Sequence, residues 1–104
     1  MIISHKIHAL RSLLEAVDLS DAVQALTFYS SAHVLWKLVD GEIDGMESKP
    51  TNAGYLLEKL ALFISYFQYA VMPCPGDERT PHQWITSAGD NLIKVESGIS
   101  EFEK

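Results

Sequence analysis

The chain has 104 residues, of which 47% are hydrophobic and 21% are charged, and this composition is typical of a single folded domain. Its 14 acidic residues against 8 Lys and Arg give a formal net charge of −6. So few cations cannot form a basic stripe that neutralises phosphates, so we expect no direct nucleic-acid binding. An acidic surface instead suits a basic patch on another protein.

The cysteine content and the hydropathy indicate a compartment. The single Cys74 excludes an internal disulfide and fits a reducing environment. The first residues lack the basic region and uninterrupted apolar core of a signal peptide. The most apolar run, residues 60–72, is shorter than the roughly 20 residues of a membrane-spanning helix. We therefore expect a cytoplasmic protein that does not enter a membrane.

Two helices are predicted before residue 41. Apolar side chains at alternating spacings of four and three mark one buried helix face. In the first helix these are Ile3, Ile7, Leu10, Leu14 and Val17. A turn at 18–20, with Ser20 as N-cap, leads to a second helix from about 21 to 40. Its apolar stripe is Ala22, Ala25, Tyr29, Ala32, Trp36 and Val39.

A loop over 41–51, rich in glycine and ending after a proline, separates these helices from a second pair. Thr51 or Asn52 caps a third helix that reaches Met72. Its core stripe is Ala53, Leu56, Leu60, Phe63, Phe67 and Ala70. The prolines of segment 73–80 end that helix.

Thr80, Pro81 and Gln83 then form the start signature of a fourth helix. Its stripe is Ile85, Ala88, Leu92, Val95, Ile99 and Phe102. Gly89 and Gly98 each weaken it by about 1 kcal/mol relative to alanine. Together the four stripes predict an all-α, antiparallel four-helix bundle that forms one domain over residues 1–104.

The second helix contains the sequence AHVLWK, which resembles the phosphorylated segment of histidine phosphotransfer domains. In that family an exposed histidine follows a small residue, with a lysine three positions on and a glycine after it. Ala32 and His33 match, but Trp36 and Lys37 replace the lysine and the glycine. A tryptophan one turn away obstructs an approaching receiver domain. We expect His33 at the edge of the core with a hydrogen-bond partner, and phosphotransfer through His33 as the alternative function.

The acids that follow, in the sequence DGEIDG, match the opening of an EF-hand calcium loop. Asp40, Glu42 and Asp44 occupy positions one, three and five, and Gly45 occupies position six. Position twelve is Thr51, where calcium requires a bidentate glutamate. We therefore interpret this segment as a solvated acidic loop without a metal.

No other cluster points to chemistry. His5 and His8 lie three residues apart near Glu15, but a specific zinc or nickel site needs three or four ligands. Cys74 has no histidine in its motif, and neither a phosphate-binding loop nor a nucleophile elbow occurs. We expect no metal, no cofactor and no enzymatic activity.

Two further stretches, LSDAVQAL at 19–26 and AGYLLEKLALFI at 53–64, resemble a family of short, uncharacterised helical-hairpin proteins from bacteria. The resemblance covers about half of the chain. It implies a helical fold and a bacterial or phage source, and it provides no activity and no site residues.

The predicted third helix carries a second apolar stripe opposite its core stripe. On a helical wheel, Tyr55, Leu62, Tyr66 and Tyr69 fall on the side away from Leu60. Tyrosine offers a large contact area with a polar tip and is enriched at protein interfaces. Two interpretations stay open: the stripe binds another protein, or another helix of the same chain covers it.

These observations predict a small, non-catalytic regulatory protein that binds another protein through Tyr55, Leu62, Tyr66 and Tyr69. By analogy with small acidic helical proteins of bacteria and phages, it would be an inhibitor, anti-activator or chaperone. A homodimer is expected as well, because two such faces can bury each other about a two-fold axis.

Overall fold

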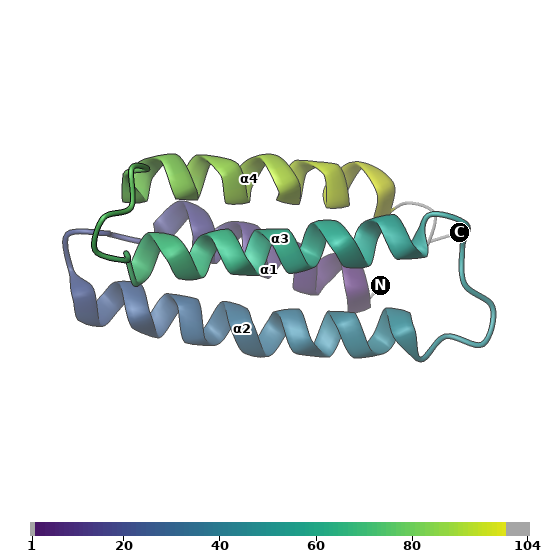
Figure 1. The fold of residues 1–104 in the computed structure, drawn as a ribbon. Coiled ribbons are helices and arrows are strands. Elements are labelled where there is room, and N and C mark those ends of the chain that lie inside the picture. The colour runs from purple at the N-terminus through teal and green to yellow at the C-terminus, as the bar shows by residue number, and fades with distance from the viewer. Residues whose placement is uncertain (1, 100–104) are drawn as a thin grey trace.

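The computed structural model describes residues 2–99, which form four α-helices running alternately up and down (Figure 1). The helices are α1 (Ile2–Ala16), α2 (Ala22–Asp44), α3 (Ala53–Val71) and α4 (Pro81–Gly98). Residues 2–99 contain no strand, so the predicted all-α four-helix bundle is confirmed. Phe102, the last member of the predicted α4 stripe, lies outside the described residues.

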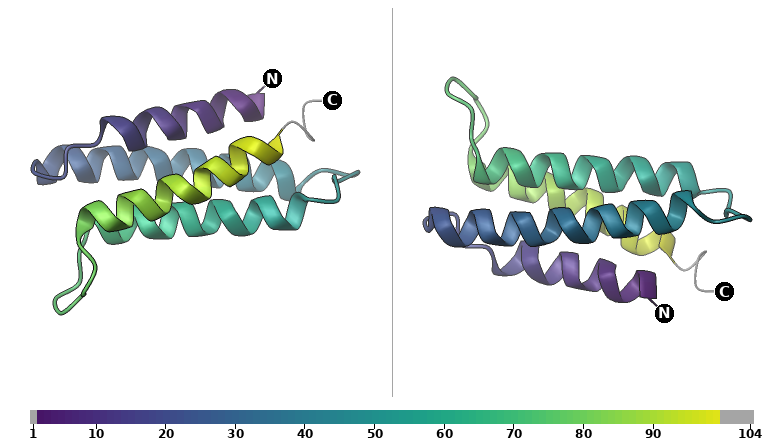
Figure 2. Two further views of the ribbon diagram at one scale, coloured as in Figure 1. Left: turned by 90° about the horizontal axis from the view of Figure 1, so that it is seen from above. Right: turned by 90° about the horizontal axis from the view of Figure 1, so that it is seen from below.

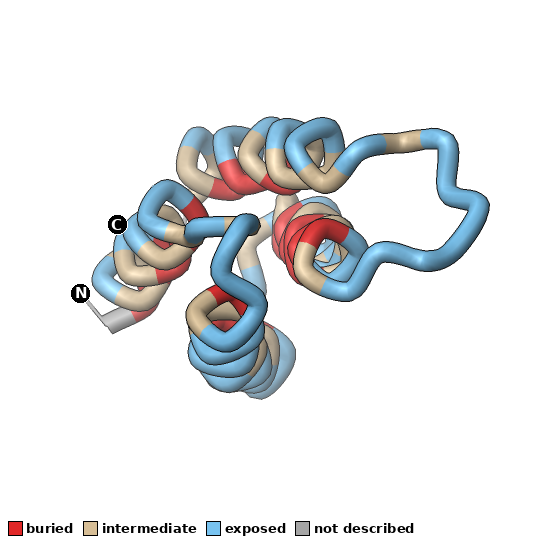
Figure 3. The backbone as a smooth tube through the Cα atoms, turned by 90° about the vertical axis from the view of Figure 1, so that its left-hand side faces the viewer, coloured by how far each residue is buried: buried red, intermediate tan, exposed pale blue. Residues whose placement is uncertain are grey.

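The helices pack around one core, and α2 and α4 lie at opposite corners when the bundle is viewed end-on (Figure 3). α3 packs most extensively against α4, and α1 packs more against α2 than against α4. The loop between α3 and α4 projects away from the bundle (Figure 2). Within residues 2–99, no helix combines the length and the apolar character needed to cross a lipid bilayer.

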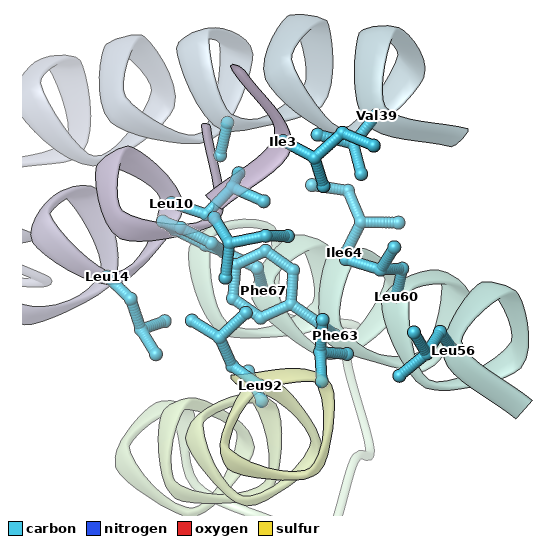
Figure 4. Close-up of a cluster of buried hydrophobic side chains, with 14 of the residues drawn as sticks. Ile3, Leu10, Leu14, Val39, Leu56, Leu60, Phe63, Ile64, Phe67 and Leu92 are labelled. Carbon is cyan, nitrogen blue, oxygen red and sulfur yellow. The ribbon is translucent and has the colours of Figure 1, made fainter. Parts of the chain in front are cut away.

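The core lies where the apolar spacing predicts it. Phe63 and Phe67 of α3 are fully buried and meet edge to face, with ring centroids 6.0 Å apart. Leu10 of α1 and Leu92 of α4 approach them from the other helices (Figure 4). Burying each such side chain contributes about 1.5–3 kcal/mol to folding. The regular stripes therefore determine how the four helices pack.

α2 begins one residue later than predicted. Asp21, not Ser20, is the N-cap, and its Oδ1 accepts a hydrogen bond from the backbone N–H of Gln24 at 3.1 Å. Ser20 instead donates its hydroxyl and its backbone N–H to Asp18 Oδ1, at 2.6 and 3.0 Å. These two hydrogen bonds lower the pKa of Asp18. The turn engages the Ser20 side chain, which leaves the cap to the next residue.

The predicted start of α4 is confirmed. Thr80 Oγ1 accepts from the backbone N–H of Gln83 at 3.2 Å, and Gln83 Oε1 accepts from the Thr80 N–H at 2.8 Å. Pro81 occupies the first helical position, where its missing N–H has no cost. In the preceding turn, Gly76 adopts a φ of 86°, a conformation that favours glycine.

α2 also ends later than predicted, at Asp44 rather than at residue 40. Gly41 therefore lies inside the helix, at a cost of about 1 kcal/mol relative to alanine. Ile43 is fully buried in the core, and Glu42 forms an ion pair with Lys6 of α1. This tertiary packing outweighs the weak helix propensity of Gly41, so the predicted loop over 41–51 was wrong at its beginning.

The two glycines of α4 have different surroundings, so the same substitution should have opposite effects. A Cβ at Gly89 would lie 3.6 Å from Leu14 Cδ2, an ordinary contact. Gly89→Ala should therefore raise the free energy of unfolding by about 0.5–1 kcal/mol. A Cβ at Gly98 would lie only 2.8 Å from Cδ2 of the fully buried Leu56. Gly98→Ala should therefore lower it by about 1 kcal/mol.

Chemical denaturation of both variants tests this contrast. Asn52 adds to the difference, because its Nδ2 donates to the Gly98 carbonyl at 3.1 Å and would lie 3.1 Å from the new methyl group. Equal stabilisation by the two alanines would contradict the close packing of Gly98 against α3.

Candidate protein-binding surface

The second stripe of α3 is partly covered and partly open. Tyr55 and Tyr69 are 46% and 41% exposed, whereas Leu62 and Tyr66 are half-buried. Tyr66 also packs against the hydrophobic core. The four residues predicted to form one contact face therefore lie along α3 as predicted, but they differ in how much of each side chain a partner could reach.

Trp84 of α4 joins this stripe, and the sequence analysis missed it. Its ring lies 5.3 Å from the Tyr66 ring and 4.9 Å from the Tyr69 ring, measured between centroids. Both separations are typical of favourable aromatic pairs. One end of the stripe is thus a three-ring cluster formed by α3 and α4. We call the surface formed by Tyr55, Leu62, Tyr66, Tyr69 and Trp84 the aromatic surface.

The loop between α3 and α4 is fixed against Trp84. The indole Nε1 donates to Asp77 Oδ2 at 2.8 Å, and Asp77 Oδ1 accepts from the backbone N–H of Arg79 at 3.0 Å. The Arg79 guanidinium lies 4.1 Å from the Trp84 ring centroid, a cation–π geometry. This guanidinium also donates to the Gln83 carbonyl at 3.2 Å and to Ser87 Oγ. The Trp84 ring is therefore held in place before any partner binds.

An open depression of about 330 Å³ lies beside this cluster. It is lined by Arg79, His82, Gln83, Thr86 and Ser87. At the opposite end of the stripe, Lys59 Nζ lies 5.3 Å from the ring of Tyr55. The aromatic surface thus has a cation at each end, and Glu58 and Glu78 are exposed close to it in the sequence.

His33 lies half-buried on α2 between two aromatic rings. Its ring centroid is 5.9 Å from that of Tyr29 and 5.2 Å from that of Trp36. The predicted position at the core edge is confirmed, but no residue from 2 to 99 forms a hydrogen bond with the imidazole, contrary to the expected partner. The Tyr29 hydroxyl donates to Gln68 Oε1 at 3.3 Å, and burial raises the pKa of Tyr29.

The acids of the EF-hand-like segment do not form a loop. Asp40, Glu42 and Asp44 all belong to the last turns of α2, where alternate residues point in different directions. Glu42 pairs with Lys6, and Asp44 Oδ1 lies 3.6 Å from Lys49 Nζ. The interpretation as a loop was therefore wrong, because Ile43 anchors the segment as helix.

His5 and His8 are exposed on α1, and Cys74 is exposed in the loop after α3. Over residues 2–99, no three His, Cys, Asp or Glu side chains come together in a way that could hold a metal ion. Comparisons of the chain with protein-family models, curated proteins and solved structures find no match.

Proposed function

We propose that this chain is a small, non-catalytic regulatory protein that acts by binding another protein through its aromatic surface. The observation that carries the proposal is the pair of exposed tyrosines, Tyr55 and Tyr69, on either side of the fixed Trp84 cluster. Tyr, Trp and Arg dominate the binding energy of protein interfaces, and each of them is present here.

Preorganisation supports the same proposal. Trp84 and Arg79 are held by the hydrogen bonds of Asp77, so a partner need not order them. The adjacent depression can accept a side chain of the partner. The exposed Glu58 and Glu78, together with the net charge of −6, favour a partner with a basic patch. We place the protein in the cytoplasm, as an inhibitor, anti-activator or chaperone of bacterial or phage origin.

The test is the combined variant Tyr55→Glu/Tyr69→Glu. Both side chains are exposed, so the helical signal should stay unchanged, whereas the affinity for a partner should fall about a hundredfold or more because each tyrosine anchor is lost. Immobilised wild-type chain captures a partner from host lysate, mass spectrometry identifies it, and calorimetry with the purified partner measures both affinities.

Ile93→Glu is the matched control, since Ile93 is exposed on α4 and outside the aromatic surface. The control should bind the partner like the wild type. A partner that binds the tyrosine variant and the wild type equally well would refute the proposed surface.

A further inference from the structure

α2 exposes an apolar face that no other helix covers within the described part of the chain. Its exposed residues fall within an arc of about 120° on a helical wheel. They are Val23, Leu26, Thr27, Ser30, Val34, Lys37 and Leu38, which we call the α2 outer face. The outward side of α2 is exposed along its length in Figure 3.

The charge of this face differs from that of the rest of the molecule. Between Ala22 and Val39, Lys37 is the only charged residue. None of the ion pairs found among residues 2–99 involves Lys37. The other helices each carry an exposed acid outside the core, for example Glu15 on α1, Glu58 on α3 and Asp90 on α4.

A chain with a net charge of −6 repels a second copy wherever acids face acids. The α2 outer face is the surface on which two copies can approach without that repulsion. We infer that it binds the same face of a second copy, with the two α2 helices antiparallel about a two-fold axis. Such an interface is self-complementary by symmetry.

The order of side chains along the face fits an axis near Ser30. The smallest side chain then lies at the centre, where it lets the two helices approach closely. Val23 near one end of the face packs close to Leu38 of the partner subunit, and by symmetry the reverse contact forms too. Apolar side chains thus meet apolar side chains on both sides of the axis.

The same symmetry gives Lys37 a partner of opposite charge. Lys37 lies opposite the first turn of the second α2, within about one helical turn of Asp21 of the partner subunit. Asp21 is exposed, and only one of its carboxylate oxygens caps its own helix. Each dimer therefore contains two Lys37–Asp21 pairs. An asymmetric acidic partner would offer no such matched arrangement.

The dimer should be weak, because one pair of helices about 35 Å long buries less than a standard interface. We expect a dissociation constant in the micromolar range. The aromatic surface is formed by α3 and α4, and α4 lies across the bundle from α2 (Figure 3). The inferred dimer therefore leaves both copies of that surface open and does not depend on the proposed function.

The first experiment uses two matched charge insertions, measured by sedimentation equilibrium from micromolar to millimolar concentration. Val34 and Ile93 are 59% and 52% exposed, on α2 and α4. Val34→Glu should weaken dimerisation about a hundredfold, because it places like charges near the axis. Ile93→Glu should dimerise like the wild type. Both should keep the wild-type circular dichroism spectrum.

The second experiment exchanges the charges of the inferred pair. Lys37→Asp alone and Asp21→Lys alone should each dimerise about tenfold more weakly, since like charges then face each other twice. Mixing the two variants should restore association as a heterodimer, because both pairs in the mixed dimer have opposite charges. Circular dichroism of Asp21→Lys checks that losing the N-cap leaves α2 folded.

Three results would overturn the inference. They are a wild-type chain that stays monomeric at millimolar concentration, a dimer that Val34→Glu leaves intact, and charge-exchanged variants that do not associate when mixed. Dimer loss in Tyr55→Glu/Tyr69→Glu would also overturn it, by moving self-association to the aromatic surface. Loss of a different protein partner in that variant, with an unchanged dimer, supports both assignments.

Discussion

Phe67→Glu should leave the chain unfolded at room temperature, with the helical circular dichroism signal largely lost. Phe67 is fully buried and contacts Phe63 and Tyr29, with ring centroids 6.0 and 5.8 Å away. A carboxylate there has no partner, and burying it costs several kcal/mol in addition to the lost packing. The milder Phe67→Ala should lower the free energy of unfolding by about 3–5 kcal/mol. Small domains have only about 5–15 kcal/mol in total.

The control lies on the same helix. Tyr55→Glu/Tyr69→Glu introduces two carboxylates at exposed positions and should change the free energy of unfolding by less than about 1 kcal/mol. Urea denaturation of both proteins provides the comparison. If the double tyrosine variant unfolds as Phe67→Glu does, the aromatic surface is part of the core and cannot be the binding surface.

The core was predictable from the sequence because burial and helical period are coupled. Each predicted stripe of α1 and α3 is buried in the structure or half-buried at its end, as Ile3 and Val17 illustrate. The boundaries of α2 were less predictable. Whether Gly41 ends a helix depends on what Ile43 packs against, and that contact is made with other helices rather than along the chain.

The aromatic surface shows the same limit. Helical geometry gave the direction of Tyr66 and Tyr69 on α3, but it could not identify the neighbour across the loop. Trp84 follows Thr80 by four residues, on the side of α4 that also carries the buried Ala88 and Val95. That shared side was visible in the sequence, and it indicated that Trp84 faces another helix. Which residues it meets depends on the packing of α4 on α3.

The α2 outer face was visible only in part. The long uncharged run from Ala22 to Leu35 is plain in the sequence, but a helix that is apolar on all sides is usually buried. The structure instead leaves Val23 and Val34 exposed, because α2 has neighbours on one side only. An apolar side chain kept in water needs a partner or costs solubility, which is why this face carries the inference of self-association.

Trp84→Ala should have the second large effect, because Trp84 joins α3, α4 and the loop between them. The substitution removes two ring contacts, one cation–π contact and the hydrogen bond to Asp77. Since Trp84 is half-buried, the free energy of unfolding should fall by about 2–3 kcal/mol, less than for a fully buried aromatic residue. Binding of the proposed partner should be lost as well.

Trp84→Phe separates the two contributions. Phenylalanine keeps a ring against Tyr66 and Tyr69 but cannot donate to Asp77, so stability should fall by about 1 kcal/mol and partner affinity should be largely retained. Thermal and urea denaturation measure the stabilities, and calorimetry with the identified partner measures the affinities. If Trp84→Ala is as stable as the wild type, the three rings do not hold α4 against α3. If it folds and still binds with wild-type affinity, the aromatic surface is structural, and the protein must use another face to reach its partner.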